Sequence, residues 1–192
     1  MKFAVFASGN GGNLQAIIDA VRNKKIKAQL SLVFSDKPHS LALTRAQKAK
    51  IETSHLSPHD YASRKEFDQA ILHILKEHHI DFIVLAGYMR LLSVHFIESY
   101  HNKILNIHPS LLPAFKGAHG IRDAYAAGVK VTGVTVHFVV EEMDGGKIIA
   151  QVPVGIDPHD TLEILQDKIH KAEHKLYPIV IDLFARGKVL PR

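Results

Sequence analysis

The sequence predicts an α/β fold in a single Rossmann-like domain, with a mainly parallel twisted sheet flanked by helices. Three observations support this class. Strand-like and helix-like segments alternate through the first 110 residues, as in a right-handed parallel sheet. A glycine-rich turn, 8–13, separates the first strand from the first helix. Two β-rich segments then flank a short turn containing Asp-Gly, which predicts an antiparallel strand excursion near the C-terminal half.

The first half of the chain supplies strand–helix units. The expected strands are 2–7, 28–34, 53–56 and 81–87. The last of them is a continuous apolar run, which is typical of a strand covered on both faces. The expected helices are 13–21, 41–50 and 64–78. Leu14, Ile17 and Ile18 show the spacing of a buried helix face in the first helix.

The second half begins with the same alternation of helix and strand and then departs from it. A helix is expected over 93–100 and a strand over 104–107, followed by a loop over 111–120 and a short helix over 121–127. The antiparallel pair is expected over 131–140 and 147–154, and a long helix over 160–185 closes the chain. Thr161 lies near the start of that helix, and Pro178 is a position at which it can bend.

The composition is that of an ordinary globular domain. The chain has 192 residues, of which 46% are hydrophobic, enough to bury a sizeable core in one domain. No apolar run is as long as a membrane helix, and the first residues become glycine-rich too early for a signal peptide, so no membrane association is expected. The absence of cysteine excludes disulfides and thiol catalysis, and it suits a reducing cytoplasm, which is the expected location.

The net charge of +5 suits anionic small molecules as partners. The densest basic cluster, 22–27, falls where the first helix should end. Cations at that position oppose the negative end of the helix dipole. The cluster therefore predicts no nucleic-acid partner.

The most informative motif is the run Asn106-Ile107-His108-Pro109-Ser110-Leu111-Leu112-Pro113. Side chains two residues apart on a strand point to the same side, so Asn106 and His108 should face one site. Asp144, from the turn Asp144-Gly145-Gly146, can complete a His/Asp pair. A carboxylate beside an imidazole favours the imidazolium, a proton donor at neutral pH, and an amide can donate to a developing oxyanion. The motif predicts acyl transfer without a covalent nucleophile, although Asp-Gly-Gly alone also makes a good turn.

The glycine-rich turn predicts an anion site for a phosphate monoester. Backbone N–H groups at a helix N-terminus bind anions, and Gly11 and Gly12 let the backbone approach a phosphate. The dinucleotide fingerprint is incomplete because Leu14 occupies its third glycine position. A nicotinamide dehydrogenase remains an alternative, since Asp36 imitates the acid that binds ribose. A tight turn that merely needs glycine is another alternative.

Several histidines invite other interpretations. His170-Lys171-Ala172-Glu173-His174 matches the pattern of one class of zinc protease, but a polar helix face fits it better and no metal is expected. His137 shares a strand face with Thr135, and a buried, hydrogen-bonded histidine is preferred there over a catalytic one. The apolar side chains around Met89 can belong either to the core or to a ligand site.

The chain resembles the folate-dependent formyltransferase superfamily almost from end to end. Besides the 106–113 run and 144–146, the resemblance rests on 8–15, Ser63-Arg64, 86–90 and Glu173-His174. It implies a single formyltransferase domain, 1–192, with a phosphate-binding half at about 1–100 and a catalytic, folate-binding half at about 101–192.

The resemblance also implies an activity and a set of site residues. The implied enzyme moves a formyl group from 10-formyltetrahydrofolate, the cosubstrate, to the glycine amine of 5-phosphoribosylglycinamide in purine synthesis, without a metal. Its implied catalytic residues are Asn106, His108 and Asp144. Its implied phosphoribosyl-substrate residues are Gly11, Gly12, Asn13 and Glu173. Its implied folate residues are Arg64, Met89, Arg90, Leu91, Leu92, Asn106, Val140 and Glu141.

The chain departs from the family's commoner pattern at two positions. His170 stands where glutamine is usual, and Gly12 replaces a frequent serine, which removes one hydroxyl donor to phosphate. The loop 115–120 falls in a segment that is typically mobile in such enzymes. Alternatives within the superfamily are methionyl-tRNA formylation and formyltetrahydrofolate hydrolysis, and a non-enzymatic alternative is a nucleotide or folate sensor. The partners expected are small molecules only, and the protein is expected to be a monomer or a homodimer.

Overall fold

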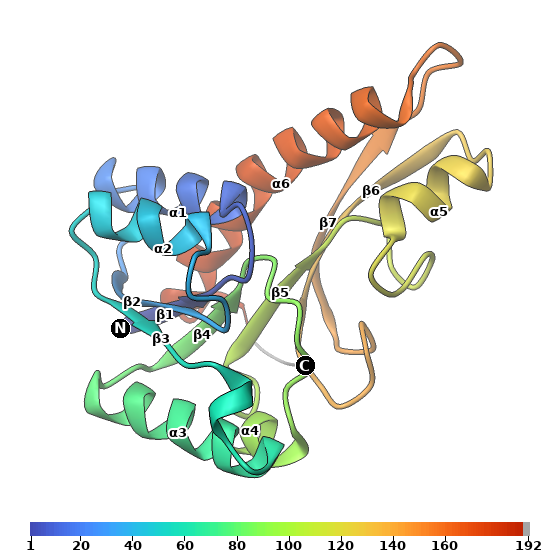
Figure 1. The fold of residues 1–192 in the computed structure, drawn as a ribbon. Coiled ribbons are helices and arrows are strands. Elements are labelled where there is room, and N and C mark those ends of the chain that lie inside the picture. The colour runs from blue at the N-terminus through green and yellow to red at the C-terminus, as the bar shows by residue number, and fades with distance from the viewer. Residues whose placement is uncertain (190–192) are drawn as a thin grey trace.

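The computed structural model describes residues 1–189, which form one α/β domain around a seven-stranded sheet in the order β3-β2-β1-β4-β5-β6-β7 (Figure 1). The strands are β1 (Lys2–Phe6), β2 (Gln29–Ser35), β3 (Thr53–His55), β4 (Phe82–Leu85), β5 (Ile104–His108), β6 (Val131–Phe138) and β7 (Ile148–Gly155). The predicted fold class is confirmed, and every strand predicted from the sequence is present with ends shifted by a few residues.

The parallel part of the sheet contains a topological switch point. β1 pairs in parallel with both β2 and β4, so the connections that follow β1 and β4 leave the same edge of the sheet in opposite directions. Ligands of open α/β sheets bind in the crevice at such a point, outside the carboxyl ends of the strands. The glycine-rich turn follows β1, which places it at this crevice.

The antiparallel part is larger than the sequence predicted. β6 and β7 form the expected antiparallel pair, but β5 also pairs antiparallel with β6. The register sets Asn106 opposite His137 and His108 opposite Thr135. The polar side chains of two distant segments therefore meet at the carboxyl end of β5.

Within residues 1–189, six α-helices pack around the sheet. They are α1 (Gly12–Arg22), α2 (Leu41–Lys48), α3 (Arg64–Glu77), α4 (Val94–Ser99), α5 (Gly120–Ala126) and α6 (Leu162–Ala185), with a short 3-10 helix η1 (Pro58–Asp60) before α3. Serine or threonine side chains accept a backbone N–H at the start of α2, α3, α4 and α6, which satisfies otherwise unpaired helix donors. α6 continues through Pro178.

The core has two layers, one on each face of the sheet. Phe3 and Val5 of β1 join the cluster under α1, α2 and α6, whereas Ala4 and Phe6 join the cluster over α3 and α4. This alternation follows from the two-residue period of a strand. Figure 1 shows the same arrangement, with α1, α2 and α6 on one side of the sheet and α3 and α4 on the other.

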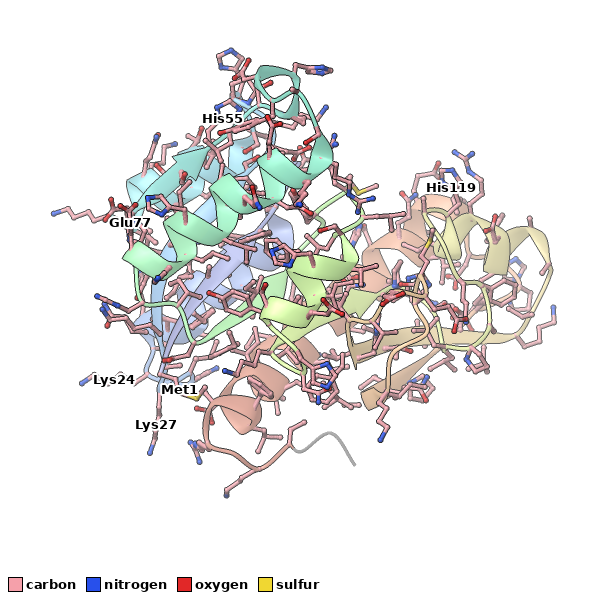
Figure 2. All side chains as sticks on the ribbon, turned by 90° about the horizontal axis from the view of Figure 1, so that it is seen from below. Met1, Lys24, Lys27, His55, Glu77 and His119 are labelled. Atoms are coloured by element: carbon pink, nitrogen blue, oxygen red, sulfur yellow. The ribbon has the colours of Figure 1, made fainter. Side chains whose placement is uncertain are left out.

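The basic cluster that follows α1 lies away from the carboxyl edge. Figure 2 shows Lys24 and Lys27 projecting beside Met1, on the opposite side of the molecule from His119. Asn23 caps α1, which agrees with cations placed near the negative end of a helix dipole.

β7 forms one free edge of the sheet, and Pro153 lies within it. Ile156 N donates to Lys130 O, and hydrogen-bonded positions alternate along an antiparallel pair. Pro153, three residues earlier and paired with Gly133, therefore occupies a position whose nitrogen faces away from β6. No helix within residues 1–189 is long and apolar enough to cross a membrane.

Candidate active site

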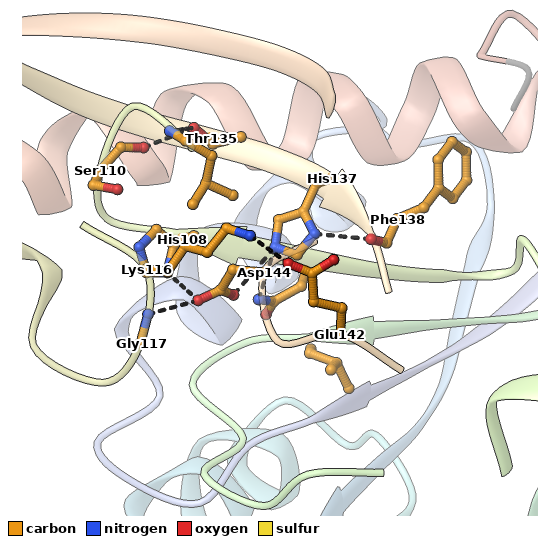
Figure 3. A network of polar contacts seen from close by, with 12 residues as sticks. His108, Ser110, Lys116, Gly117, Thr135, His137, Phe138, Glu142 and Asp144 are labelled. Atoms are coloured by element: carbon orange, nitrogen blue, oxygen red, sulfur yellow. Dashed lines mark hydrogen bonds and ion pairs between the residues drawn. The ribbon is translucent and has the colours of Figure 1, made fainter. Parts of the chain in front are cut away.

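The candidate site is a cluster of polar side chains at the carboxyl end of β5. β5 supplies Asn106 and His108, β6 supplies His137, and the β6–β7 connection supplies Asp144 (Figure 3). His108 and His137 are buried, with 4% and 2% of their surfaces exposed. The cluster is therefore an organised interior group at the carboxyl end of β5, rather than a set of surface side chains.

His108 is held at both ring nitrogens by acceptors. Its Nδ1 lies 3.4 Å from Oδ2 of Asp144, and its Nε2 lies 2.8 Å from the carbonyl oxygen of Phe115. A carboxylate and a carbonyl can only accept, so both nitrogens find partners when both carry protons. The structure thus places an acceptor at each ring nitrogen of His108, including the carboxylate of Asp144 with which the motif was expected to pair it.

The surroundings of Asp144 favour the ionised form of its carboxyl group. Burial raises the pKa of its carboxyl group, but the N–H of Gly117 and the charge of His108 act in the opposite direction, and the pKa of Asp144 lies below its usual range. Gly117 N donates to Oδ2 at 2.8 Å. Asp144 also has φ +52°, a left-handed conformation that aspartate tolerates better than most residues. It is a turn residue and an ionised partner of His108 at once.

Asn106 contacts His137 rather than Asp144. Its Nδ2 lies 3.2 Å from Nε2 of His137, whose Nδ1 lies 2.8 Å from the carbonyl oxygen of Phe138. The expectation of a buried, hydrogen-bonded histidine at 137 is confirmed. Nε2 of His137 is also 3.6 Å from Oδ1 of Asp144, so all four side chains form one continuous group.

A second polar network, which the sequence did not reveal, supports the end of β5. Thr135 Oγ1 accepts from Leu112 N at 3.0 Å and donates to Ser110 O at 2.7 Å. Gln151 Nε2 donates to both Leu112 O and Thr135 Oγ1 at 2.9 Å. These contacts join β6 and β7 to the loop after β5. Because they pair side chains with backbone groups far away in sequence, no local pattern indicates them.

The loop between β5 and α5 covers the cluster. Its carbonyl at Phe115 and its N–H at Gly117 contact His108 and Asp144, as described above. Lys116 forms a salt bridge of 2.7 Å with Glu142, which lies in the same connection as Asp144. Phe115 and Gly117 thus contact two of the catalytic candidates, and Lys116 between them contacts the connection that carries Asp144.

The glycine-rich turn forms a second group at the same edge. Gly11 has φ +71°, and a Cβ there would lie 2.9 Å from Cα of Ala42, so both the conformation and the packing require glycine. Asn13 Nδ2 donates to Glu173 Oε2 at 3.1 Å, while the buried Oδ1 of Asn13 has no hydrogen-bond partner within residues 1–189. Asn13 and Glu173 are therefore brought together although they lie at opposite ends of the chain.

His170 and His174 flank Glu173 on α6. His170 Nδ1 lies 2.9 Å from Glu173 Oε2, and this hydrogen bond raises the pKa of His170. Burial lowers the pKa of His174, whose Nε2 would lie 3.3 Å from a Cβ on Gly12. Across the described residues, no group of three or more His, Cys, Asp or Glu side chains is arranged to hold a metal ion.

Asp36 does not offer a ribose-binding carboxylate. It is buried and accepts a hydrogen bond of 2.6 Å from Ser8 Oγ, which also accepts from Met89 N at 3.0 Å. Asp36 thus fixes the turn after β1 to the segment after β4. This internal role removes the feature that favoured a dehydrogenase.

The predicted folate residues after β4 combine exposed apolar groups with cations. Met89 and Leu91 are 69% and 60% exposed, so they are not core residues. Arg64 donates to the carbonyl of Leu91, and Arg90 lies over the ring of Phe67. Of the other predicted folate residues, Leu92 packs against the α3–α4 core. Val140 and Glu141 are exposed.

Comparison with known proteins agrees with this geometry. The sequence model of the formyl transferase family matches residues 1–181. The chain belongs to the formyl transferase family. It is therefore an enzyme that moves a one-carbon formyl group.

Individual relatives of this formyl transferase agree in sequence and in structure. It is 48% identical to phosphoribosylglycinamide formyltransferase of Bacillus subtilis, over 94% of this chain and 92% of the relative. It is 45% identical to the human trifunctional purine biosynthetic protein adenosine-3, covering 98% of this chain and 19% of that protein. The crystal structure of glycinamide ribonucleotide transformylase 1 from Symbiobacterium toebii superimposes with a TM-score of 0.97 at 43% identity, covering 100% of this chain and 91% of the other.

Proposed function

We propose that this formyl transferase moves the formyl group of 10-formyltetrahydrofolate to the glycine amine of 5-phosphoribosylglycinamide, a step of purine biosynthesis. The observation that carries the proposal is His108, held between Asp144 and the Phe115 carbonyl beside Asn106. This arrangement supplies a proton donor and an amide donor where formyl transfer needs them.

The proposed reaction is direct attack of the amine. Its nitrogen forms a bond to the formyl carbon, and the electrons of the C=O double bond move to oxygen. Asn106 donates an N–H to that oxyanion, and His108 stabilises its charge. The oxyanion then reforms the C=O double bond as the bond from carbon to the folate nitrogen breaks, and His108 gives that nitrogen a proton, so that it leaves as a neutral amine. The attacking nitrogen releases a proton, which restores the imidazolium.

The loop after β5 must move for this chemistry. Nε2 of His108 lies 2.8 Å from the Phe115 carbonyl oxygen, so a proton on that nitrogen would point to this carbonyl. The folate nitrogen needs the same proton, so the Phe115 carbonyl has to withdraw while substrates are bound. The surface salt bridge between Lys116 and Glu142 is weak enough to permit this.

The substrate phosphate is proposed to bind at Gly11, Gly12 and Asn13. The N-terminus of α1 offers backbone donors and a favourable dipole there. Glu173 lies 3.1 Å from Nδ2 of Asn13, so it is placed to accept from the ribose or the glycinamide portion. The N-terminal half, about 1–100, would then hold phosphate, and the half at about 101–192 would carry catalysis.

The folate is proposed to bind along Met89–Leu92 and Val140–Glu141, with Arg64 nearby. Exposed Met89 and Leu91 offer apolar contacts to a flat ring system, and Arg64 and Arg90 offer charge to the carboxylates of the folate tail. Small-molecule partners, a cytoplasmic location and a monomeric or homodimeric state complete the proposal, and no metal enters any step.

One assay tests the function. Purified protein is incubated with 10-formyltetrahydrofolate and phosphoribosylglycinamide, and folate deformylation and formylated product are measured together. Equal amounts of both support the proposal. Deformylation without a formylated acceptor would indicate a hydrolase, formylation of methionyl-tRNA instead would indicate another transferase, and binding without turnover would indicate a sensor.

A further inference from the structure

The cluster beside β5 contains two buried imidazoles but one carboxylate. Asp144 contacts His108 through Oδ2 and approaches His137 through Oδ1. His108 alone has acceptors at both nitrogens within 3.4 Å. The cluster therefore raises the question of which ring carries the positive charge and what the other ring does.

Charge balance assigns the cation to His108. One carboxylate compensates one imidazolium, and a second imidazolium on His137 would be a buried charge without a counter-ion, which is strongly unfavourable. His137 is 2% exposed, so water offers it little compensation. Its contact with Asp144, at 3.6 Å, is also longer than a hydrogen bond, whereas its contact with Asn106 is 3.2 Å.

The carbonyl of Phe138 decides which nitrogen of His137 carries the single proton. That carbonyl can only accept, so Nδ1, 2.8 Å away, must donate. The carbonyl is itself fixed, because the backbone of Gly146 packs so closely that a Cβ there would lie 1.7 Å from Phe138 O. A neutral ring with its proton on Nδ1 has a bare Nε2, which must accept.

We infer that His137 is a positioning residue that orients the amide of Asn106. Its bare Nε2 accepts one N–H of Asn106 Nδ2, which prevents the amide from rotating its oxygen into that place. The second N–H of the same nitrogen is then free to donate to the oxyanion of the substrate. This role rests on the proposed function, since it concerns the oxyanion of formyl transfer.

The first test reads the tautomer without any turnover. Long-range ¹H–¹⁵N correlation spectra of imidazole-labelled protein at neutral pH distinguish a protonated nitrogen from a bare one. We expect His137 to show a protonated Nδ1 and a bare Nε2. A proton on Nε2, whether alone or together with one on Nδ1, would overturn the inference, because Asn106 would then have to turn its oxygen toward the ring.

The second test is a double-mutant cycle with Asn106. His137→Leu removes the acceptor, whereas His137→Gln can offer an oxygen near the position of Nε2. We expect His137→Leu to lower kcat about 10-fold or more with KM little changed, and His137→Gln to recover much of that loss. In the Asn106→Ala background, His137→Leu should change kcat less than about twofold, because its route to the substrate is gone.

The outcomes separate this inference from the proposed function. Equal losses from His137→Leu in both backgrounds would mean that His137 acts independently of Asn106, and would overturn the inference. Thermal unfolding of each variant shows whether it folds, and the spectra of the unmodified protein decide the tautomer if a variant does not. A wild-type protein that transfers no formyl group would overturn the proposed function instead.

Discussion

At the scale of single residues, the proposed chemistry depends on a carboxylate kept ionised beside a buried ring. The pKa of Asp144 is lowered, because the N–H of Gly117 and the charge of His108 act against the effect of burial. His108 lies between this carboxylate and a backbone carbonyl. Each residue is held by partners from a different part of the chain, so a change in one partner should alter a specific measurable property.

Replacing His108 with Ala should lower kcat by about 10²–10⁴-fold with KM for both substrates little changed, because a proton donor and oxyanion partner is removed. Steady-state kinetics with both substrates measures the effect. His73, which is 73% exposed on α3, provides the control, and His73→Ala should leave kcat unchanged. A His108→Ala rate within threefold of wild type would refute the role of His108.

Replacing Asp144 with Asn should change how stability depends on pH. The folded-state pKa of Asp144 is lowered, so its carboxylate stabilises the fold above the unfolded-state pKa of about 4, and this contribution is lost as pH falls through the lower folded-state pKa. The free energy of unfolding of wild type should exceed that of Asp144→Asn near pH 7, and the difference should shrink below about pH 4.

Urea unfolding at a series of pH values measures that difference. Asp123→Asn, on the exposed side of α5, is the matched control for removing a negative charge. A difference between wild type and Asp144→Asn that stays constant from pH 7 to pH 3 would contradict the lowered pKa. In the same variant, kcat at neutral pH should fall about 100-fold if Asp144 also orients His108.

At the scale of elements, the loop between β5 and α5 is the part that has to move in the proposed reaction. It has no secondary structure of its own between His108 and Gly120, and three of its groups contact the site. The loop closes through contacts that are individually modest. Its closed and open states should therefore interconvert readily.

Replacing Lys116 with Ala should loosen this loop without destabilising the domain. The salt bridge with Glu142 lies at the surface, where such pairs contribute about 0–1 kcal/mol. Hydrogen exchange at the Gly117 amide should accelerate by up to about fivefold while the melting temperature stays within about 2 °C. Addition of 1 M salt to wild type should have a similar effect. Unchanged exchange at Gly117 would show that the salt bridge does not hold the loop.

The elements also show which features sequence patterns can and cannot predict. The helical spacing of apolar residues in 13–21 predicted α1, and the continuous apolar run in 81–87 predicted β4, because burial leaves its pattern within each segment. The antiparallel pairing of β5 with β6 was missed, since a short strand does not encode the direction of its neighbour. The predicted proximity of Asn106 and His108 followed from strand geometry. The contacts of Phe115, Thr135 and Gln151 depend on backbone atoms brought in by the tertiary fold.

At the scale of the whole molecule, a single sheet joins the two proposed halves. β4, from the first half, pairs in parallel with β5 from the second, and α6 packs against α1 as well as β6 and β7. Ser8 and Asp36 further connect the segments after β1, β2 and β4. The proposed phosphate and folate sites thus share one rigid support.

This continuity predicts that the chain unfolds as one unit. Urea transitions followed by far-UV circular dichroism and by tyrosine fluorescence should coincide, because no boundary in the sheet allows one half to unfold alone. A circular-dichroism transition that clearly precedes the fluorescence transition would contradict the single-domain description. Added phosphoribosylglycinamide should shift both transitions equally, since it binds the folded state only.

The free edges of the sheet bear on how copies of the chain can associate. β3 has three residues, and β7 carries Pro153, which offers no N–H at an outward-facing position. A second molecule that extended the sheet at β3 would pair with only a short strand. At β7 it would lack one backbone N–H donor, because Pro153 has none. Any dimer of this protein is therefore expected to form by side-chain packing between surfaces, and crowding at high concentration should not lead it into strand-by-strand polymers.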